Sequence, residues 1–523
     1  MKNTIKPYKN ELPSKFSERV AINYANFISK EQKKDLGQFF TSANMAKFMS
    51  SMADFDQPNE ELKILDPGCG LLSLTCALLE SIIEKKISLK RVDIDAYELD
   101  TFLINSTKLV SNYLISWCKE NALDVVINLS NADFILSNAE LIKQPTGVRA
   151  YDYIISNPPY FKIRKEDLRL KIFNNALQGQ QNIYGLFLLA SSRLLKNHGQ
   201  LIFIVPRSFT SGLYFQSFRE LFLDAVSIED FHIFHSRKDG FKRDHVLQEN
   251  IILKAKLKLS SSHQNKIRIT SSNGICDIEQ MQEKVFSKNA LIKNIGELSV
   301  IHLPINDQEE RAIELFSTWN NNLKSLGIKA STGPIVPFRS KSYLKHHKTS
   351  TQNCVPLLWM HNCMKMELNW PHKKAEKEAW IVDNSLSNSK TIENSNYIFL
   401  RRFSSKDDTS KLIATPHLKD DLDFAKLGVE NHLNYLYKPN GTMDHLEIFG
   451  LSVLYNSTLF DSYFRSLAGN TQISATELNF TPLPPIEIIR TIGKQYLSLN
   501  GKGVREIDNI VNSAFDLTEN LNK

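Results

Sequence analysis

The sequence predicts an α/β first half built on a mostly parallel sheet, followed by a mixed α+β second half. Residues 62–66 read as a buried strand, a glycine loop follows, and residues 71–83 read as an apolar helix. Strands and helices alternate until a polar, Ser-rich stretch begins after residue 258. Because 523 residues are too many for one core, we predict one domain at 1–258, with a helical segment at 1–50, and a second at 259–523.

The loop after the first strand reads Pro67-Gly68-Cys69-Gly70 and follows Asp66. A strand, a glycine loop and a helix in this order open a nucleotide-binding unit, because Gly68 and Gly70 let a ligand approach the backbone. No Gly-Lys-Ser/Thr follows, so the loop is not a phosphate-binding P-loop. Taken alone the loop is a weak signal, and the strands that follow it strengthen the interpretation.

A second strand is expected at residues 92–97, and it ends at Glu98. An acid at the carboxyl end of this strand can accept hydrogen bonds from both hydroxyls of a ribose. Asp93 and Asp95 compete for that role, but they come earlier on the strand. We therefore interpret Glu98 as the candidate ribose ligand.

A third strand is expected at residues 125–129, followed by Asp133 and Phe134. Asp133 could accept from an adenine amino group, and Phe134 could cover the ring. For either acid alone, a solvated loop carboxylate is the more common case. Glu98 and Asp133 together end successive strands of one sheet, and this coincidence indicates a bound adenosine.

The β-rich run at residues 151–156 stops at Asn157-Pro158-Pro159-Tyr160, because two prolines cannot continue a strand ladder. An exocyclic amino group is a poor nucleophile, since its lone pair is delocalised into the ring. Acceptors aimed at its two protons free that lone pair, and the side-chain oxygen of Asn157 and the main-chain oxygen of Pro158 are such acceptors. Tyr160 offers a face on which a base can stack. The alternative is a proline-stopped strand with an incidental asparagine.

Two further positions are candidates for the same site. Thr41 or Ser42 is a plausible N-cap for a helix, and free N–H groups there could hold a carboxylate, although an ordinary cap explains the pattern equally well. Phe241 is the only apolar side chain in a polar loop, so it either pins the loop or faces a ligand. The neighbouring elements expected are helices at 183–195 and 213–225 and strands at 199–206, 227–234 and 246–256.

The second half mixes short β-like runs with aromatic and basic residues. Asn, Gln and Arg side chains read base edges, and basic residues among aromatics suit a phosphate-lined surface. Any one of these charges is more often a solvated surface residue. The candidate DNA-binding residues are Arg339, Lys341, Arg401, Arg402, Asn470 and Gln472.

Composition limits the remaining classes of function. The net charge of +7 and pI near 8.8 permit a polyanionic partner without requiring one. The six cysteines are scattered with no zinc-site spacing, so we expect free thiols and no metal. No apolar run is long enough to span a membrane and no signal peptide is recognisable, which predicts a cytoplasmic protein without a membrane partner.

Together these motifs resemble the γ-type adenine-specific N6 DNA methyltransferases of bacterial restriction–modification systems, in which the cofactor motifs precede a target-recognition domain. The resemblance implies a class I, Rossmann-like methyltransferase domain with S-adenosylmethionine as cofactor. It also implies double-stranded DNA as substrate, a bacterial or archaeal source, and a possible cognate restriction endonuclease acting on the same site. The expected activity is methylation of an adenine swung out of the duplex, which protects host DNA.

The resemblance assigns roles to individual residues. LGQFFT, with Thr41, is similar to the motif that holds the methionine part of the cofactor; DPGCG, AYELD and NADF are similar to its loop, ribose and adenine motifs. By the same comparison Asn157, Pro158 and Tyr160 form the catalytic turn, and Phe241 is a second aromatic against the flipped base. The chain departs from the family at Leu72, where glycine is frequent, and at Asn479, where an arginine is expected.

Other activities fit parts of the pattern. Cytosine C5 methylation needs a Pro-Cys pair, which this sequence lacks, and cytosine N4 enzymes usually carry Ser where Asn157 stands. A protein glutamine N5-methyltransferase could share the same turn but would not need the second half. The chain could also be a DNA-binding module with an inactive transferase fold. A fused nuclease is not indicated, because no convincing Pro-Asp with a downstream Glu-x-Lys is present.

Overall fold

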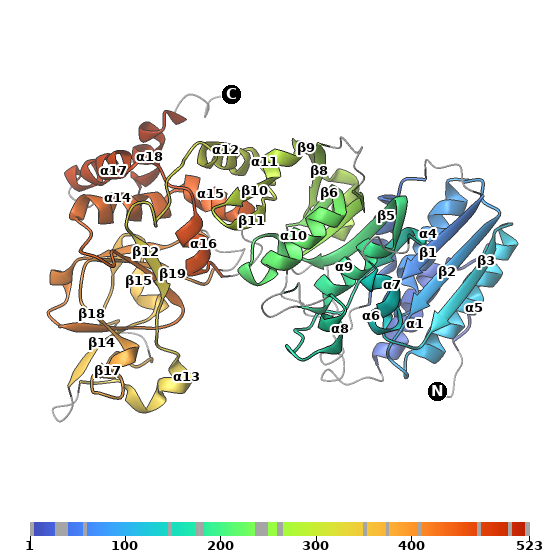
Figure 1. The fold of residues 1–523 in the computed structure, drawn as a ribbon, viewed down its shortest axis with the longest axis horizontal. Coiled ribbons are helices and arrows are strands. Elements are labelled where there is room, and N and C mark those ends of the chain that lie inside the picture. Colours follow the sequence, from blue (N-terminus) through green and yellow to red (C-terminus); the bar gives the residue numbers. More distant parts are fainter. Residues whose placement is uncertain are drawn as a thin grey trace. The chain divides into compact units, whose positions relative to one another are not determined.

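The computed structural model describes residues 5–26, 40–55, 60–144, 149–173, 177, 182–235, 249–258, 265–348, 353–372, 376–404, 410–467, 472–499 and 505–517. The chain divides into two compact units, Met1–Leu291 and Ile292–Lys523 (Figure 1). This division comes later than the boundary at 258/259 predicted from the sequence. The reason is that two strands after residue 258 extend the sheet of the first unit instead of starting a new core.

The first unit is built on a nine-stranded sheet with the strand order β3-β2-β1-β4-β5-β7-β6-β8-β9. The strands are β1 Glu61–Asp66, β2 Arg91–Tyr97, β3 Asp124–Ser130, β4 Tyr151–Ser156, β5 Leu195–Pro206, β6 Val226–Phe234, β7 Asn250–Leu257, β8 Lys266–Ser272 and β9 Gln282–Ser287. β1 to β5 run parallel, and β7 is the first antiparallel strand, between β5 and β6. The predicted α/β class is therefore confirmed.

The strand order reverses between β1 and β4. From β1 the chain moves outward to β2 and β3, whereas β4 pairs on the other side of β1 and leads to β5. In an open sheet of this kind the crevice for a ligand lies beyond the carboxyl ends of the strands at this switch point. The loops that follow Asp66 and Ser156 therefore flank the natural binding position of the fold.

Helices connect these strands in two groups. Right-handed crossovers in opposite directions put α4 and α5 on one face of the sheet and α9 on the other. α1 and α3 pack with α4, and α10 packs with α9. The helices are α1 Pro13–Ala25, α3 Ala43–Ser51, α4 Ser73–Glu84, α5 Ile104–Glu120, α6 Phe134–Ser137, α7 Ala139–Lys143, α8 Leu168–Lys171, α9 Ile183–Leu194, α10 Gln216–Ala225 and α11 Lys288–Leu291. The helices expected after the glycine loop and after the proline turn are confirmed, with ends shifted by one or two residues.

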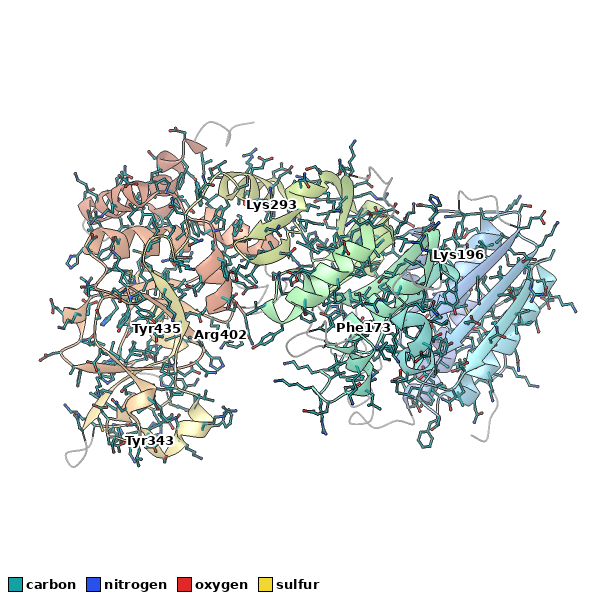
Figure 2. All side chains as sticks on the ribbon, viewed as in Figure 1. Phe173, Lys196, Lys293, Tyr343, Arg402 and Tyr435 are labelled. Carbon is teal, nitrogen blue, oxygen red and sulfur yellow. The ribbon has the colours of Figure 1, made fainter. Side chains whose placement is uncertain are left out.

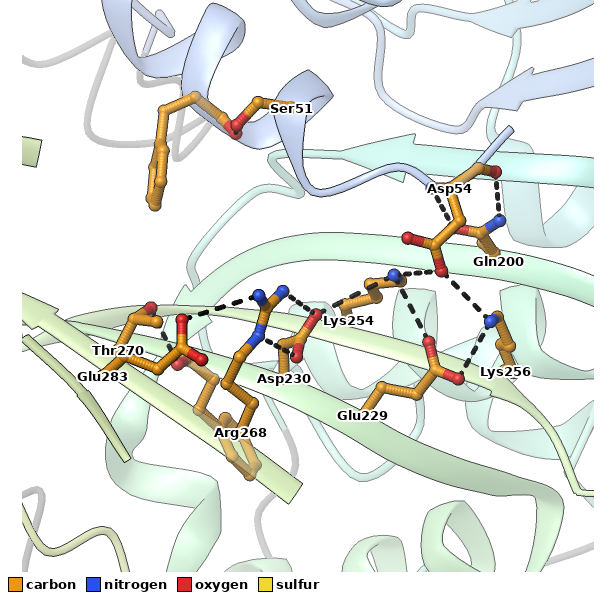
Figure 3. Close-up of polar contacts among 12 residues, drawn as sticks. Ser51, Asp54, Gln200, Glu229, Asp230, Lys254, Lys256, Arg268, Thr270 and Glu283 are labelled. Atoms are coloured by element: carbon orange, nitrogen blue, oxygen red, sulfur yellow. Dashed lines mark hydrogen bonds and ion pairs between the residues drawn. The ribbon is translucent and has the colours of Figure 1, made fainter. Parts of the chain in front are cut away.

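An ion-pair network fastens the end of α3 to the sheet (Figure 3). The Nζ atom of Lys254 on β7, almost fully buried, lies 2.6 Å from Asp54 Oδ2, and Lys256 Nζ lies 3.2 Å from the same oxygen. Burial alone would raise the pKa of Asp54, but the two ammonium groups hold it below its ordinary value. Gln200 also pairs with both main-chain groups of Asp54. The network thereby holds the helix whose first turn faces the candidate site.

The second unit is a mixed α+β structure, as predicted. Its main sheets have the orders β12-β22-β19-β20 and β13-β17-β14-β21-β18. The strands are β10 Ile292–Ile295, β11 Leu298–Ile301, β12 Lys329–Thr332, β13 Leu344–Lys345, β14 Cys354–Leu358, β15 Cys363–Met364, β16 Glu367–Leu368, β17 Trp380–Val382, β18 Thr391–Glu393, β19 Tyr397–Arg401, β20 Ala414–His417, β21 Lys426–Val429 and β22 Leu433–Tyr437. The helices are α12 Asp307–Phe316, α13 Pro337–Ser340, α14 His445–Asn456, α15 Thr458–Leu467, α16 Ala475–Phe480, α17 Ile486–Ser498 and α18 Ile507–Ala514.

The second unit has its own hydrophobic core. α14, α15 and α17 bury apolar faces against β12, β19 and β22, and Phe316 of α12 stacks on Tyr463 of α15 with ring centroids 3.8 Å apart. Within the described residues, no helix is long and apolar enough to cross a membrane. The same residues contain no group of three or more His, Cys, Asp or Glu side chains that could hold a metal ion.

Candidate functional site

The glycine loop after β1 lies against the proline turn after β4. A Cβ atom at Gly68 would lie 3.3 Å from Phe187 Cε1 and 3.9 Å from Pro159 Cδ. Gly70 has φ +52°, in the left-handed region that favours glycine, and a Cβ there would lie 3.9 Å from the Phe40 ring. The two segments that the sequence predicts to form one site are therefore neighbours.

Asn157 connects the proline turn to the segment just before α3. Its Nδ2 donates to Thr41 Oγ1 over 3.1 Å, and its Oδ1 accepts from the Tyr160 hydroxyl over 2.6 Å. Ser42, rather than Thr41, is the N-cap of α3, since its side chain accepts from Met45 N–H. Because Thr41 does not cap the helix, its hydroxyl is available to hold the carboxamide of Asn157, whose side chain is partly exposed.

The Tyr160 hydroxyl has one proton and two acceptors within reach. Besides Asn157 Oδ1, the main-chain oxygen of Ile204 on β5 lies 2.8 Å away. Burial, with Tyr184 nearby, raises the pKa of Tyr160 well above its ordinary value, so the hydroxyl keeps its proton. When that proton turns to Ile204, Asn157 Oδ1 no longer receives the hydrogen bond from Tyr160.

Glu98 lies where the second strand meets the glycine loop. One carboxylate oxygen accepts from Gly70 N–H over 3.0 Å, and the other accepts from Asp100 N–H over 2.7 Å. The residue is 8% exposed, and burial raises the pKa of its carboxyl group. Leu99 N–H is a third backbone donor to this carboxylate, which still leaves capacity for a further hydrogen bond while the glycine loop holds Glu98 in place.

Asp66 is more deeply buried than its neighbours in the site. Its Oδ2 accepts from the Thr75 hydroxyl over 2.6 Å, and its Oδ1 is buried with no hydrogen-bond partner among the described residues. Burial raises the pKa of Asp66 to about 7. An acceptor left without a donor is costly in a protein interior, so this oxygen is a candidate for contact with a ligand's ammonium or hydroxyl group.

Asp133 and Phe134 make protein contacts that the sequence did not predict. Asp133 Oδ1 caps α6 through Leu136 N–H, and its Oδ2 lies 3.3 Å from Arg169 Nη1. Arg169 also forms a two-pronged pair with Asp167. The Phe134 ring is 2% exposed and packs against Tyr97 and Phe187. The proposed adenine contacts of both residues remain predictions.

The backbone at Leu72, the first departure from the family pattern, has a conformation that favours glycine. It has φ +59°, a left-handed conformation, and it ends the cofactor loop just before α4. A residue other than glycine is strained there by roughly 1 kcal/mol. The Leu72 side chain is fully buried in the core of the unit, and this burial compensates for the strain. Leu72 therefore combines a strained backbone conformation with a fully buried side chain.

Among the predicted DNA-binding residues that the structure describes, Arg402 and Gln472 contact each other in the second unit. Arg402 Nη2 lies 3.4 Å from Gln472 Oε1. Arg401 points to the other side of β19, where its guanidinium donates to Cys363 O. Arg339 and Lys341 lie exposed on and after the short helix α13. Asn470, and the candidate catalytic aromatic Phe241, lie outside the described residues.

Asn479, the second departure from the family pattern, has a structural role. From α16 its Oδ1 accepts from Ala330 N–H over 2.8 Å and its Nδ2 donates to Ala330 O over 3.0 Å. Ala330 lies on β12, at the edge of its sheet. The carboxamide thus pairs with an edge strand as a neighbouring strand would, and an arginine could not supply the acceptor.

Sequence reasoning missed several residues of the site. Phe187 separates the Gly68 loop from Phe134, and Arg169 pairs with Asp133. Phe187 is one apolar residue within a helix that is buried along nearly its whole length, so its spacing carries no distinguishing signal. Arg169 lies within a charged run that reads as surface, and only the fold brings it to Asp133.

Comparison with known proteins gives one family match and several relatives. Residues 71–241 match the family described as Eco57I restriction-modification methylase. The chain is 30% identical over 494 residues to the type II methyltransferase M.PstI of Providencia stuartii, covering 94% of this chain and 95% of that protein. It is 30% identical over 485 residues to M.BsuBI of Bacillus subtilis, covering 91% of this chain and 93% of that protein.

A solved structure matches most of the chain in fold. The chain resembles the cryoEM structure of a DrdV–DNA complex with a TM-score of 0.50 and 13% sequence identity. The match covers 93% of this chain and 59% of that one. At this level of identity the likeness concerns the fold of the chain alone.

Proposed function

Because this chain belongs to the type II methyltransferases of restriction–modification systems, we propose that it methylates the N6 atom of an adenine in a specific sequence of double-stranded DNA. Its first unit has the fold of the class I S-adenosylmethionine-dependent methyltransferases. The observation that carries the proposal is the position of Asn157 at the carboxyl end of β4, beside the glycine loop and with its carboxamide held by Thr41 and Tyr160.

S-adenosylmethionine is the proposed cofactor, and the residues at the switch point fit it. Glu98 can accept from a ribose hydroxyl, since its backbone N–H donors do not use all the lone pairs of its carboxylate. The partnerless Oδ1 of Asp66 suits a cationic or hydroxyl-bearing part of the ligand. Gly68 and Gly70 let it approach the backbone, and Asp133 and Phe134 are the proposed adenine contacts. When bound, this cofactor supplies an electrophilic methyl group.

The protein's part in the reaction is to orient the adenine and to raise its nucleophilicity. Asn157 Oδ1 and the main-chain oxygen of Pro158 accept from the two amino protons, so that the N6 lone pair is no longer held in the ring. The Tyr160 proton moves to Ile204 O, so that Tyr160 no longer competes with the amino group for Asn157 Oδ1. The partly exposed ring of Tyr160 offers a stacking face for the flipped base, with Phe241 as the proposed second aromatic. No strong general base is required, because the N6 proton becomes acidic once the methyl group is attached.

The test is product analysis of the whole protein. Incubation with labelled S-adenosylmethionine and mixed-sequence DNA should give N6-methyladenine at one short sequence, and DNA isolated from an expressing host should carry the same mark. N4-methylcytosine as the only product would overturn the adenine assignment. Label in glutamine of added protein, with none in DNA, would favour the protein methyltransferase alternative. No product at all would favour an inactive DNA-binding module.

A cognate restriction endonuclease acting on the same sequence is the proposed functional partner. DNA methylated by this protein should then resist one endonuclease of the host and remain sensitive to endonucleases that cut other sequences.

A further inference from the structure

Three separate segments of the second unit converge at one end of the sheet β12-β22-β19-β20. The residue after β19, Arg402, donates its main-chain N–H to His432 O over 2.9 Å, and its own main-chain oxygen accepts from Ile473 N–H over 2.9 Å. Phe403 pairs with Gln472 as an isolated bridge. Main-chain hydrogen bonds therefore hold together stretches that are some 30 and 70 residues from Arg402 along the sequence, at the place where Figure 2 labels Arg402.

A buried carboxyl group, that of Glu430, lies next to the place where these segments meet. Glu430, between β21 and β22, is 0% exposed; its Oε1 lies 2.6 Å from His432 Nδ1 and its Oε2 accepts from His432 N–H over 3.1 Å. Gly333 closes over it, since a Cβ there would lie only 2.3 Å from Glu430 O. Burying a carboxyl group is unfavourable unless it is paired. His432, which lies next to both oxygens of Glu430, is therefore the group beside which this carboxyl group is buried.

The groups in front of Glu430 are partly exposed and of mixed hydrogen-bonding character. The His432 side chain is 44% exposed and, with Nδ1 engaged, has Nε2 as its second polar atom. Arg402 donates to Asn431 O over 3.1 Å, and its guanidinium lies 5.7 Å from the centre of the Phe403 ring, which also contacts His432 edge-on. The Arg402 Nε and Ser404 Oγ atoms are buried without a hydrogen-bond partner among the residues that the structure describes.

From this geometry we propose that Arg402, His432 and Gln472 form a base-reading cluster, which contacts the edges of base pairs in the DNA substrate, and that Glu430 is its positioning residue. The proposal rests on the proposed function, because it names the part of that protein which selects the sequence. Guanidinium, carboxamide and imidazole groups offer both donors and acceptors, the combination that distinguishes one base pair from another.

A phosphate contact is the less suitable alternative. Phosphate oxygens only accept hydrogen bonds, whereas the Gln472 carboxamide oxygen is itself an acceptor directed at Arg402. This mixed donor and acceptor character favours base edges over the DNA backbone as the ligand of the cluster.

The first experiment compares the sequences methylated by the wild-type protein and by His432→Ala. The wild type defines the recognition sequence, and a set of duplexes with each base pair of that sequence replaced in turn then measures discrimination. His432→Ala should lose about tenfold or more of the discrimination at one base position and none at the others. His445→Ala, an exposed histidine at the start of α14, is the matched control and should methylate the same sequence as the wild type.

Two more variants keep the test decisive if His432→Ala fails to fold. His432→Gln retains a side chain that can donate and accept, and should change the preferred base at the same position. Glu430→Gln retains an acceptor beside Nδ1 but removes the carboxyl group's charge, and should reduce discrimination at that position alone. A purely structural role for Glu430 would lower activity on all duplexes by the same factor.

The outcomes separate this inference from the proposed function. A wild-type protein that methylates no DNA would overturn both. A wild-type protein with a defined sequence, together with unchanged discrimination in all three variants, would overturn the base-reading cluster alone. Equal weakening on every duplex, with the slope of log affinity against log salt concentration reduced by about one, would make the cluster a phosphate contact and also overturn it.

Discussion

The two units bring their candidate site residues together in different ways. In the first unit Gly68, Glu98 and Asn157 follow parallel strands, so their loops meet at one edge of the sheet by the logic of the fold. In the second unit Arg402 and His432 meet because antiparallel strands of irregular order happen to end at the same place. A parallel sheet therefore makes a site predictable from strand order, whereas an antiparallel sheet does not.

The comparison extends to the acids that the units bury. Burial raises the pKa of both Asp66 and Glu430 to about 7. Each has one oxygen without a hydrogen bond among the described residues, but Glu430 Oε1 lies 2.6 Å from His432 Nδ1, whereas no charged partner lies beside Asp66 Oδ1 among those residues. We therefore expect a ligand to interact with the oxygen of Asp66 that lacks a partner. Glu430 instead interacts with His432 within the protein.

The largest effect is expected at the strand-end site. Asn157→Ala removes the acceptor proposed for the N6 amino group, and methyl transfer should fall by about 1000-fold or more. Binding of S-adenosylmethionine, measured by calorimetry, should stay within a few-fold of wild type, because the proposed role of Asn157 is to contact the substrate amino group and not the cofactor. Asn112→Ala, on the exposed face of α5, is the control. Loss of cofactor binding in Asn157→Ala would mean that the turn is misassigned.

The next effect is on stability and depends on pH. In Asp66→Asn the buried ionisable group is gone. For wild-type Asp66 the folded pKa of about 7 lies above the unfolded value of about 4, so the folded state binds the extra proton and stability falls as pH rises from about 4 to 7. Without ligand, the free energy of unfolding of the variant should exceed that of the wild type by up to about 3 kcal/mol at pH 8 and by little at pH 4.

Urea unfolding of both proteins at the two pH values measures this difference. Asp124→Asn, at an exposed position on β3, is the matched control. Its stability should differ from that of the wild type by the same small amount at both pH values. A difference between Asp66→Asn and wild type that does not change with pH would show that Asp66 is not buried in the charged form.

A third test separates backbone strain from side-chain burial at Leu72. Leu72→Ala leaves a cavity in the core and keeps a Cβ atom at φ +59°, so it should destabilise the first unit by about 3 kcal/mol. Leu72→Gly leaves the same cavity but relieves the left-handed strain, and should be less destabilising by about 1 kcal/mol. Thermal unfolding measures both. An alanine variant more stable than the glycine variant would contradict the strained backbone.

The smallest effect is expected for the asparagine of the second unit. Asn479→Ala removes the two hydrogen bonds to Ala330 and should cost about 1–2 kcal/mol of stability, since both main-chain groups lose a partner. Methyl transfer at saturating substrate should be unchanged, in contrast to Asn157→Ala. Asn479→Asp keeps the acceptor but not the donor, so its stability should fall between that of the wild type and that of Asn479→Ala. A loss of sequence discrimination in Asn479→Ala would indicate that α16 contributes to recognition.

Much of the first unit could be predicted from the sequence because its signals are local. The strand ending at Ser156 and the asparagine after it, and the helix beginning near Ser42, follow from propensity, proline geometry and capping. The later domain boundary could not be predicted in this way. β8 joins the first sheet by pairing parallel with β6, and pairing across such a distance in sequence leaves no local pattern.

Contacts between side chains from distant segments also could not be predicted from the sequence. The hydrogen bond from Tyr160 to Asn157 lies within one turn, yet its competition with Ile204 depends on where β5 runs. The pairing of Asp133 with Arg169 and the burial of Glu430 behind His432 likewise depend on how whole elements pack.

The sequence by itself determined which chemical groups are available: glycines in a strand-to-helix loop, an acid at the end of the next strand, and an asparagine held between a strand and two prolines. Hydrophobic periodicity and turn chemistry act over a few residues, so they can be read from the chain. Only the tertiary structure decided which of these groups are buried, which are paired with one another, and which retain hydrogen-bonding capacity for a ligand. Burial and pairing depend on strands and loops that come together across tens to hundreds of residues, and no local pattern records that distance.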